Sequence, residues 1–198
     1  MDGFTRRKEM KKSDILNAAW ALFMEFGVQK VSVAEIARKA NVSQVTIYNY
    51  FESKENLVHE VIIFYIDKEW LEYELLLKSN VPFPDKIKQI IFNKKETANK
   101  IHEDFYQYFM KEYAAEMSYI ENLYIEKTVP SFINLFNEGK EQGYIDKDLS
   151  NEAILFYIQM MKEHMQREDV YQKVLPMTEE LMNLLFYGIM GKKEDEKK

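Results

Sequence analysis

The side chains between residues 44 and 50 are of the kinds that read the edges of base pairs. Gln44 and Asn49 carry amides, and one amide can make two hydrogen bonds to an adenine. The methyl groups of Val45 and Thr46 suit contact with the methyl group of thymine. Tyr50 adds an aromatic side chain to the same outward surface. We therefore expect a helix at these residues that lies in the major groove of DNA.

A reading surface of this kind needs a helix whose other side is anchored in a core. Ser43 can accept a hydrogen bond from a backbone N–H of the following turn, so we expect it to cap the helix. Ile47, Tyr48 and Phe51 follow at spacings that predict inward-facing side chains. The pattern thus predicts a short helix with one anchored side and one free side.

Another short helix is predicted immediately before this one. Val33, Ile36, Ala37 and Ala40 repeat at helical spacing, and Ala37 is small enough for a second helix to cross closely over it. Asn41 comes next, and asparagine adopts a positive φ at low cost, so the chain can turn sharply there. Two helices joined by a tight turn form a helix-turn-helix, whose second helix would read DNA.

From about Ser13 to Leu57 the sequence resembles the N-terminal DNA-binding domain of the tetracycline-repressor (TetR) family of bacterial regulators. Two positions depart from the commonest family pattern. Asn41 stands in place of the usual turn glycine, and Tyr50 stands where a histidine is frequent, which leaves the identity of one phosphate or base contact open. The matching features are Phe23 and Phe26 before Gly27, the pair Ile36 and Ala37, the pair Val42 and Ser43, Tyr48 with Phe51, and Lys54 with Glu55.

This resemblance implies an all-α fold and a division of the chain. A three-helix helix-turn-helix DNA-binding domain with a basic N-terminal arm is expected at residues 1–53, and a helical effector-binding and dimerisation domain at residues 54–191. Residues 192–198 are expected to form a disordered tail. The expected DNA contacts are Ser32, Ser43, Gln44, Val45, Thr46, Tyr48, Asn49, Tyr50 and Lys54.

The composition agrees with a helical protein of the cytoplasm. The chain has 198 residues, 46% of them apolar, and no cysteine, so disulfides and thiolate metal sites are excluded. No basic-then-apolar leader opens the sequence, and no run of 18 uncharged apolar residues occurs. We therefore expect a cytoplasmic protein without a membrane partner.

The net charge of −6 is unusual for a protein that binds DNA, but its distribution is uneven. Residues 1–56 hold nine Lys and Arg against seven Asp and Glu, whereas residues 57–198 hold eighteen against twenty-six. We expect the first twelve residues to form a flexible basic arm that contacts phosphates or the minor groove, although a charged run is also compatible with a plain solvated surface. The basic residues of this arm are Arg6, Arg7, Lys8, Lys11 and Lys12.

The rest of the chain is predicted to be helical. Ser53 is expected to cap a long helix that runs to Lys78, and the prolines at 82 and 84 stop it. Pro130 predicts either a kink in the helix from Ser118 to Gly139 or a boundary between two shorter pieces. The other expected helices run from a cap at Asp85 to about Ala98, and over about Glu103–Glu116, Asn151–Arg167 and Thr178–Met190.

Aromatic residues crowd residues 57–136, where the family resemblance implies an effector pocket. Such residues more often form core than a ligand site, but buried tyrosines tend to edge cavities because their hydroxyls need partners. A small, largely apolar effector is expected. The candidate ligand-binding residues are Ile62, Tyr65, Ile66, Glu69, Phe92, Phe109, Tyr113 and Tyr124.

The last two predicted helices carry broad apolar stripes. Both stripes could pack on the core of their own subunit, but one reading helix contacts too few base pairs to be specific, and helix-turn-helix proteins meet this need as two-fold dimers. The resemblance implies a homodimer through these helices. The expected interface residues are Ile154, Leu155, Ile158, Met161, Met165, Leu181, Leu184, Leu185 and Ile189.

Motifs of enzymes are absent from the sequence. None of His59, His102 and His164 has a glutamate three positions before it, and the HExxH, GxSxG and glycine-rich phosphate motifs do not occur. No cofactor and no metal is expected. Two hypotheses remain: a ligand-responsive regulator, most often a repressor, that binds a palindromic double-stranded DNA operator, and a catalytically silent helical module that binds a ligand or protein.

Overall fold

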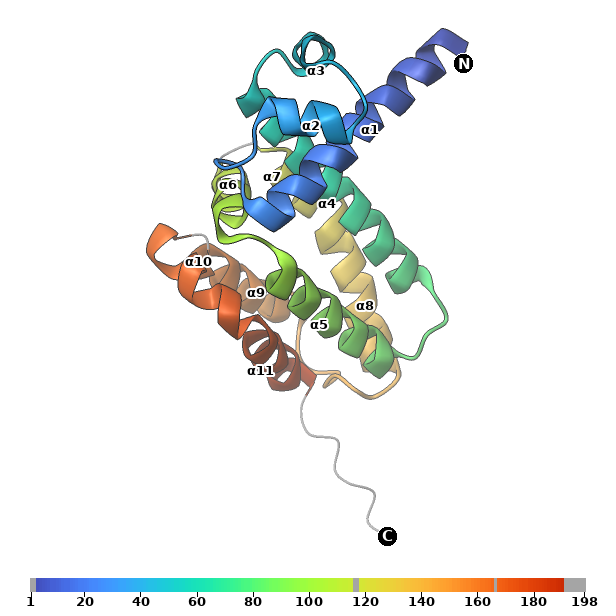
Figure 1. The fold of residues 1–198 in the computed structure, drawn as a ribbon. Coiled ribbons are helices and arrows are strands. Elements are labelled where there is room, and N and C mark those ends of the chain that lie inside the picture. The colour runs from blue at the N-terminus through green and yellow to red at the C-terminus, as the bar shows by residue number, and fades with distance from the viewer. Residues whose placement is uncertain (1–2, 116–117, 166, 191–198) are drawn as a thin grey trace. The chain divides into compact units, whose positions relative to one another are not determined.

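The computed structural model describes residues 3–115, 118–165 and 167–190 (Figure 1). Every regular element in these ranges is a helix, which confirms the all-α fold class. The chain forms two compact units, the first comprising Met1–Glu69 and Lys100–Ala115, the second Trp70–Asn99 and Glu116–Lys198. In the described part of the chain, no helix is both long and apolar enough to span a bilayer.

The first unit joins the N-terminal helices to the first half of α4 and to α6. Its core is apolar and includes Phe23 and Phe105, both fully buried. The sequence sets the limit of the DNA-binding domain at residue 53, and this limit stays a prediction, as does the tail, which lies outside the described residues. The helices are α1 (Gly3–Phe26), α2 (Val33–Lys39), α3 (Gln44–Phe51), α4 (Lys54–Lys78) and α6 (Glu103–Ala114).

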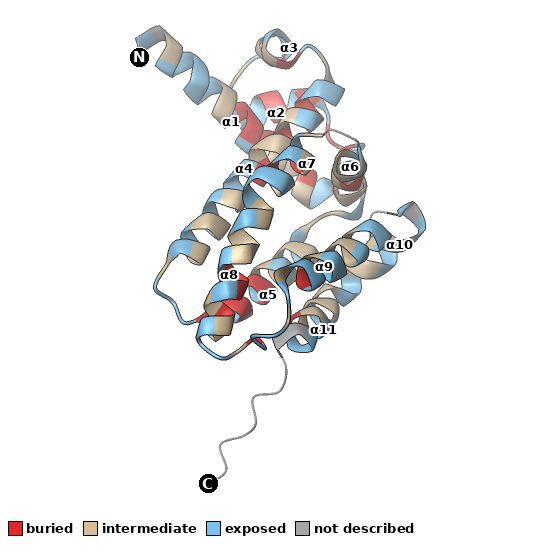
Figure 2. Cartoon of the chain, turned by 180° about the vertical axis from the view of Figure 1, so that it is seen from behind, coloured by how far each residue is buried: buried red, intermediate tan, exposed pale blue. Residues whose placement is uncertain are grey.

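The expected flexible basic arm is wrong for the residues described. Helix α1 begins at Gly3 and continues without a break through the basic stretch, whose turns are largely exposed (Figure 2). The stretch contains neither proline nor an internal glycine after Gly3, so nothing interrupts helical hydrogen bonding before the apolar part of α1. The basic residues are therefore presented on a helix.

The second unit is built around one apolar core. Phe83, Ile87 and Ile90 of α5 meet Phe136 of α8 and Ile154 of α9 there. A side chain at Gly139 would come within 2.8 Å of the Phe83 ring, so the glycine allows α8 to lie directly on that ring. The elements are the second half of α4, α5 (Phe83–Lys100), α7 (Tyr119–Leu123), the π-helical η1 (Tyr124–Thr128), α8 (Val129–Glu141), α9 (Asn151–Met165), α10 (Glu168–Val174), the 3-10 turn η2 (Leu175–Met177) and α11 (Thr178–Met190).

Prolines explain where two helices begin. The predicted cap at Asp85 is wrong, because the carbonyl of Pro82 accepts from the N–H groups of Asp85 and Lys86 at 2.9 and 3.1 Å, and α5 starts at Phe83. Pro130 lies in the first turn of α8, directly after the π-helical η1, so it stands at a boundary between two helical pieces that follow one another without a break. The sequence pattern does not predict α10, which follows the end of α9 at Met165.

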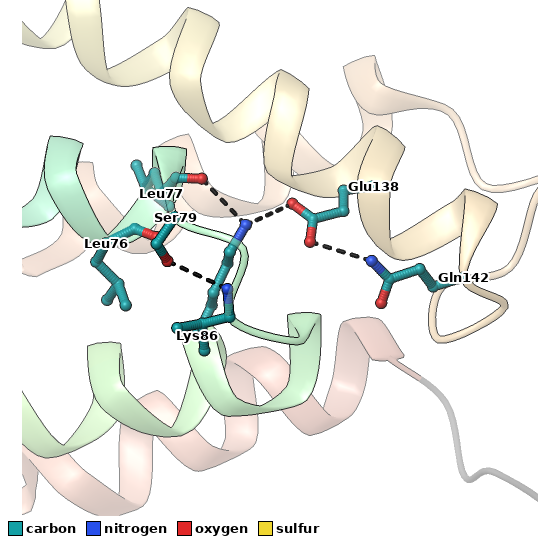
Figure 3. Close-up of polar contacts among 7 residues, drawn as sticks. Leu76, Leu77, Ser79, Lys86, Glu138 and Gln142 are labelled. Atoms are coloured by element: carbon teal, nitrogen blue, oxygen red, sulfur yellow. Dashed lines mark hydrogen bonds and ion pairs between the residues drawn. The ribbon is translucent and has the colours of Figure 1, made fainter.

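A buried ion pair holds three elements of the second unit together (Figure 3). The side chain of Lys86 is only 3% exposed, and its ammonium lies 2.8 Å from the carboxylate of Glu138 on α8. The same ammonium donates to the backbone carbonyl of Leu77 at the end of α4, at 3.1 Å. Gln142 donates to the other oxygen of Glu138. Lys86 thus fixes the end of α4 to α5 and α8.

Candidate nucleic-acid interface

The turn between α2 and α3 has the geometry expected of a helix-turn-helix. Asn41 adopts a φ of 53°, the left-handed conformation predicted for this position. The N–H of Val42 donates to the carbonyl of Ala37 at 2.9 Å, and Ala37 is buried. The small side chain of Ala37 and the left-handed Asn41 together let α3 follow α2 after a short connection.

Helix α3 is capped and anchored largely as the sequence indicates. The hydroxyl oxygen of Ser43 accepts from the N–H of Thr46 at 3.0 Å, and the two hydroxyls lie 2.8 Å apart. Ile47 and Phe51, one helical turn apart, are buried. Gln44, Val45 and Asn49 are exposed, so they form the free side of α3.

The expectation that Tyr48 faces inward is wrong. Its side chain is 46% exposed, because Ile47 and Phe51 define the buried line of α3 and Tyr48 lies about 100° around the helix from Ile47. Tyr48 therefore lies nearer to the free side, which is compatible with its place among the expected DNA contacts.

Tyr50 connects α3 to α1. Its hydroxyl donates to the backbone carbonyl of Lys8 at 3.2 Å, and its ring lies 6.0 Å from that of Phe51. A histidine at this position could not reach as far, so the departure from the family pattern has a structural consequence. The side chain of Tyr50 ties the basic part of α1 to the reading helix.

Ser32 and Lys54, both expected to contact DNA, also have structural partners. Ser32 forms a capping box with Glu35: its hydroxyl oxygen accepts from the N–H of Glu35, and the Glu35 carboxylate accepts from the N–H of Ser32 at 2.8 Å. The hydrogen bond from the Ser32 side chain lowers the pKa of Glu35, with the backbone bond in support. The ammonium of Lys54 donates to the carbonyl of Val28 at 2.7 Å.

The basic residues of α1 differ in their surroundings. Lys12 pairs with Glu60 at 2.8 Å and lies 5.9 Å above the ring of Phe51. Arg6, Lys8 and Lys11 are exposed, and their side chains have no partner within the described part of the chain. These three cations are available to an external anion.

Six of the eight candidate effector residues belong to the first unit, and they differ in burial and in their ring contacts. Ile62, Tyr65 and Ile66 are buried. Tyr65 meets the edge of Phe109 at 6.4 Å between ring centroids, and Phe109 stacks on Tyr113 at 6.2 Å. Glu69 is half-buried at the unit's limit.

Two further aromatic rings differ in their relation to this aromatic group. Trp20 of α1 stacks on Tyr65 at 6.0 Å, and sequence reasoning missed it because α1 precedes the region searched for a pocket. Phe92, the seventh candidate, is exposed on α5 in the second unit.

Tyr124, the eighth candidate, faces a lysine. The ammonium of Lys162 lies 3.9 Å from the centre of the Tyr124 ring, at the start of the π-helical turn. Burial raises the pKa of Tyr124. Burial also lowers the pKa of Lys162, an effect that Glu121 and Glu163 oppose.

Several expected interface residues belong to the core of their own subunit. Ile154 is 2% exposed, and Leu155, Ile158 and Leu185 pack against the same core. Their apolar spacing predicts burial but does not distinguish a subunit core from a partner subunit. Met161, Met165 and Leu181 are half-buried, and the side chain of Ile189 lies outside the described residues.

Other apolar side chains of the same helices point into solvent. Leu184, which was expected at the interface, is 67% exposed, and Tyr187 follows one turn later on α11. Phe156, Tyr157 and Met160 are exposed on α9. Sequence reasoning missed Phe156, Tyr157 and Met160, although their spacing of one helical turn could have indicated a second apolar face on α9.

The helix-turn-helix lies inside a stretch of sequence that matches known proteins. Residues 15–61 match the family model described as bacterial regulatory proteins, tetR family. The chain is 24% identical to the HTH-type transcriptional repressor KstR2 of Mycobacterium tuberculosis over 162 residues, 80% of each chain. It is 25% identical to the uncharacterized HTH-type transcriptional regulator YdgC of Bacillus subtilis, over 91% of this chain and 93% of that one.

Solved structures share the fold. The ketosteroid transcriptional regulator KstR2 of Mycobacterium tuberculosis superposes with a TM-score of 0.53 and 20% identity, over 91% of this chain and 95% of that one. A gamma-butyrolactone receptor gives a TM-score of 0.58 at 15% identity, over 93% and 90%. The family and the named relatives are transcriptional regulators, so the expectation of a regulator and not an enzyme is confirmed.

Proposed function

We propose that this chain, which belongs to the tetR family of bacterial regulatory proteins, is a repressor that binds a palindromic DNA operator as a homodimer and responds to a small, largely apolar effector. The observation that carries the proposal is the free side of α3. Gln44, Val45 and Asn49 project from a helix that Ser43 caps and that Ile47 and Phe51 anchor. A rigid helix with free amide and methyl groups suits direct reading of a major groove.

Phosphate binding would come from α1. Arg6, Lys8 and Lys11 lie on the helix that Tyr50 connects to α3, so a cationic surface accompanies the reading helix within one unit. Phosphate contacts supply most of the sequence-independent affinity for DNA. The positive charge of residues 1–56 would therefore act locally, although the whole chain is acidic. Because its target is DNA, the protein would act in the cytoplasm.

Dimerisation would use the exposed apolar side chains of α9 and α11. Phe156, Tyr157 and Met160 on α9, with Leu184 and Tyr187 on α11, leave large apolar areas in water. A two-fold contact between two copies would cover them and would present two reading helices about 34 to 36 Å apart, the spacing of successive major grooves on one face of DNA. The operator would then be palindromic.

The effector is proposed to be largely apolar. Tyr65, Phe109 and Tyr113 form an aromatic group within the first unit, and aromatic walls with a few hydroxyls suit apolar ligands that carry isolated oxygens. Relatives of the same fold are described as a ketosteroid transcriptional regulator, a gamma-butyrolactone receptor and a fatty acid degradation regulator. Steroids, lactones and fatty acids all share this chemistry.

Effector binding would change the spacing or the angle of the reading helices. A ligand shifts such an equilibrium only through different affinities for the two states, and a 100-fold loss of operator affinity requires about 2.7 kcal/mol of coupling. Helix α4 runs unbroken from Lys54 to Lys78 and contributes residues to both units, so it is a candidate transmitter.

The alternative is a catalytically silent helical module that binds a ligand or a protein but no operator. A gel-shift assay with fragments of the source genome separates the two. The proposal predicts retarded fragments that share one palindrome, and it fails if every fragment binds equally weakly. Mass spectrometry of small molecules retained by the purified protein after incubation with metabolite extracts would then identify the effector.

A further inference from the structure

The start of α6 is hydrogen-bonded to the corner between α1 and α2. The N–H of His102 donates to the carbonyl of Met24 at 3.0 Å. Two residues later, the carboxylate of Asp104 accepts from the N–H of Gln29 at 2.9 Å. Both bonds reach the backbone of the corner, residues 24–29, so they constrain its path whatever side chains it carries.

Gly27 shows how closely α6 approaches this corner. It adopts a φ of +80°, and a Cβ there would lie 2.8 Å from Nδ1 of His102 and 2.9 Å from a carboxylate oxygen of Asp104. His102 is itself fixed, because its Nδ1 accepts from the N–H of Asp104 at 3.1 Å as the cap of α6. Only glycine satisfies both the conformation and the space.

The corner also receives a bond from α4 and rests on buried aromatic rings. Lys54 donates to the carbonyl of Val28. Val28 lies between Gly27 and Gln29, the two residues that α6 approaches most closely. Phe23 and Phe105, both fully buried, meet at 5.8 Å between ring centroids beneath the start of α6. Helix α6 therefore holds the corner through two hydrogen bonds, one from its backbone and one to the Asp104 side chain, and through a packed aromatic pair, whereas α4 adds one hydrogen bond from a side chain.

The corner leads directly into the reading head, by which we mean the helix-turn-helix formed by α2 and α3. Three residues after Gln29 the chain reaches Ser32, whose capping box starts α2, and α2 leads through Asn41 to α3. A change in the path of residues 27–29 therefore changes the direction in which α2 and α3 leave α1. Because α2 and α3 are joined by a tight turn and contact one another, such a change would affect both.

We propose that His102 and Asp104 are positioning residues for DNA reading, which set the direction of α2 and α3 by holding the corner from α6. The inference rests on the proposed function. It gives α6 a direct connection to the reading head that does not pass through α4. Phe109 and Tyr113, two candidate effector residues, lie further along the same helix, so a displacement of α6 by an effector would reach the corner directly.

Three variants at the start of α6 isolate the bond from Asp104. Asp104→Leu removes the carboxylate and leaves the N–H of Gln29 without its acceptor. Asp104→Asn removes the same charge from the first turn but keeps an oxygen that can accept. Glu103→Leu removes the neighbouring first-turn charge of an exposed residue that has no partner in the corner. Any effect of the helix dipole is thus shared by all three.

The measurements use an operator selected from random duplexes by the unmodified protein. Asp104→Leu is expected to lower the ratio of operator affinity to affinity for a random duplex by roughly tenfold, with the affinity for the random duplex unchanged. Hydrogen exchange at the amide of Gln29 should become about tenfold faster. Asp104→Asn and Glu103→Leu should resemble the unmodified protein.

A second pair of variants keeps the inference testable if Asp104→Leu fails to fold. His102→Leu removes the cap of α6, whereas His102→Asn supplies an equivalent acceptor and should restore the affinity ratio. An unchanged ratio in either Leu variant, together with faster exchange at Gln29, would overturn the inference and leave the proposed function standing. If the unmodified protein selects no sequence at all, the proposed function fails and this inference fails with it.

Discussion

The ammonium of Lys54 donates a hydrogen bond to the backbone carbonyl of Val28 at 2.7 Å, which joins the first residue of α4 to the corner after α1. A lysine at the start of this helix is expected from the sequence to contact phosphate, but its position gives it a structural role as well. Lys54→Met should lower the free energy of unfolding by about 1 kcal/mol, the usual worth of one such bond.

The same variant should weaken binding to both operator and random duplexes without changing the preferred operator sequence, because Lys54 is expected to contact phosphate and does not touch base edges in this account. Chemical denaturation and fluorescence anisotropy measure the two effects. A change in the preferred operator sequence would show that Lys54 takes part in base reading.

Gln44 is expected to read a base. Its side chain is exposed on the free side of α3, so Gln44→Ala should cost roughly 1 to 3 kcal/mol of operator affinity per half-site and relax the preference at one base pair in each half-site. The salt dependence should stay as it is, since no charge is removed. Selection experiments on random duplexes with both proteins provide the comparison, and identical selected sequences would contradict the role of Gln44.

Lys11 and Lys12 make a matched pair for phosphate binding. Lys11 has no partner in the described residues, whereas Lys12 already pairs with Glu60 at 2.8 Å. Lys11→Gln should reduce the slope of log affinity against log salt by about 0.9 for each of the two subunits, without changing the preferred sequence. Lys12→Gln should reduce it less. Equal slopes for the unmodified protein and Lys11→Gln would place the N-terminal part of α1 away from DNA.

Substitution of Lys86 and substitution of Glu138 should lower the free energy of unfolding by different amounts. Glu138→Leu leaves the ammonium of Lys86, whose side chain is 3% exposed, with the carbonyl of Leu77 but without a carboxylate, so it should lower the free energy of unfolding by about 3 kcal/mol or more. Lys86→Met fits an apolar side chain into the same space and leaves Glu138 near solvent with Gln142 as a donor, so its cost should be below about 1.5 kcal/mol. Urea denaturation of the two variants tests this order. A larger loss of unfolding free energy in Lys86→Met than in Glu138→Leu would contradict it.

Local patterns predicted much of the fold and of the reading helix. The cap at Ser43, the left-handed Asn41 and the limits of α4 depend on short-range chemistry that a sequence displays directly. Tyr48 was misplaced because helical spacing gives a direction only to within the width of the buried stripe. The cap at Asp85 was misplaced because the carbonyl of Pro82 competes successfully for the first N–H groups of α5.

Contacts between distant parts of the chain were beyond local patterns. Nothing in the spacing of His102 and Asp104 indicates that they hold residues 24–29, because that contact depends on how α6 packs in the first unit. The apolar stripe that includes Ile154 and Ile158 is real, but only the structure shows that it faces its own core and that Phe156 lies on the opposite side.

The central claim is that two copies of this chain read one palindromic operator, and sedimentation equilibrium with the selected duplex tests it most directly. The account predicts two chains per duplex for the unmodified protein. Phe156→Asp combined with Leu184→Asp places charges on exposed positions, so the variant should keep its circular dichroism, sediment as a monomer and lose operator binding. One chain per duplex at full affinity would contradict the claim, whereas a double variant that stays dimeric would contradict the proposed interface on α9 and α11.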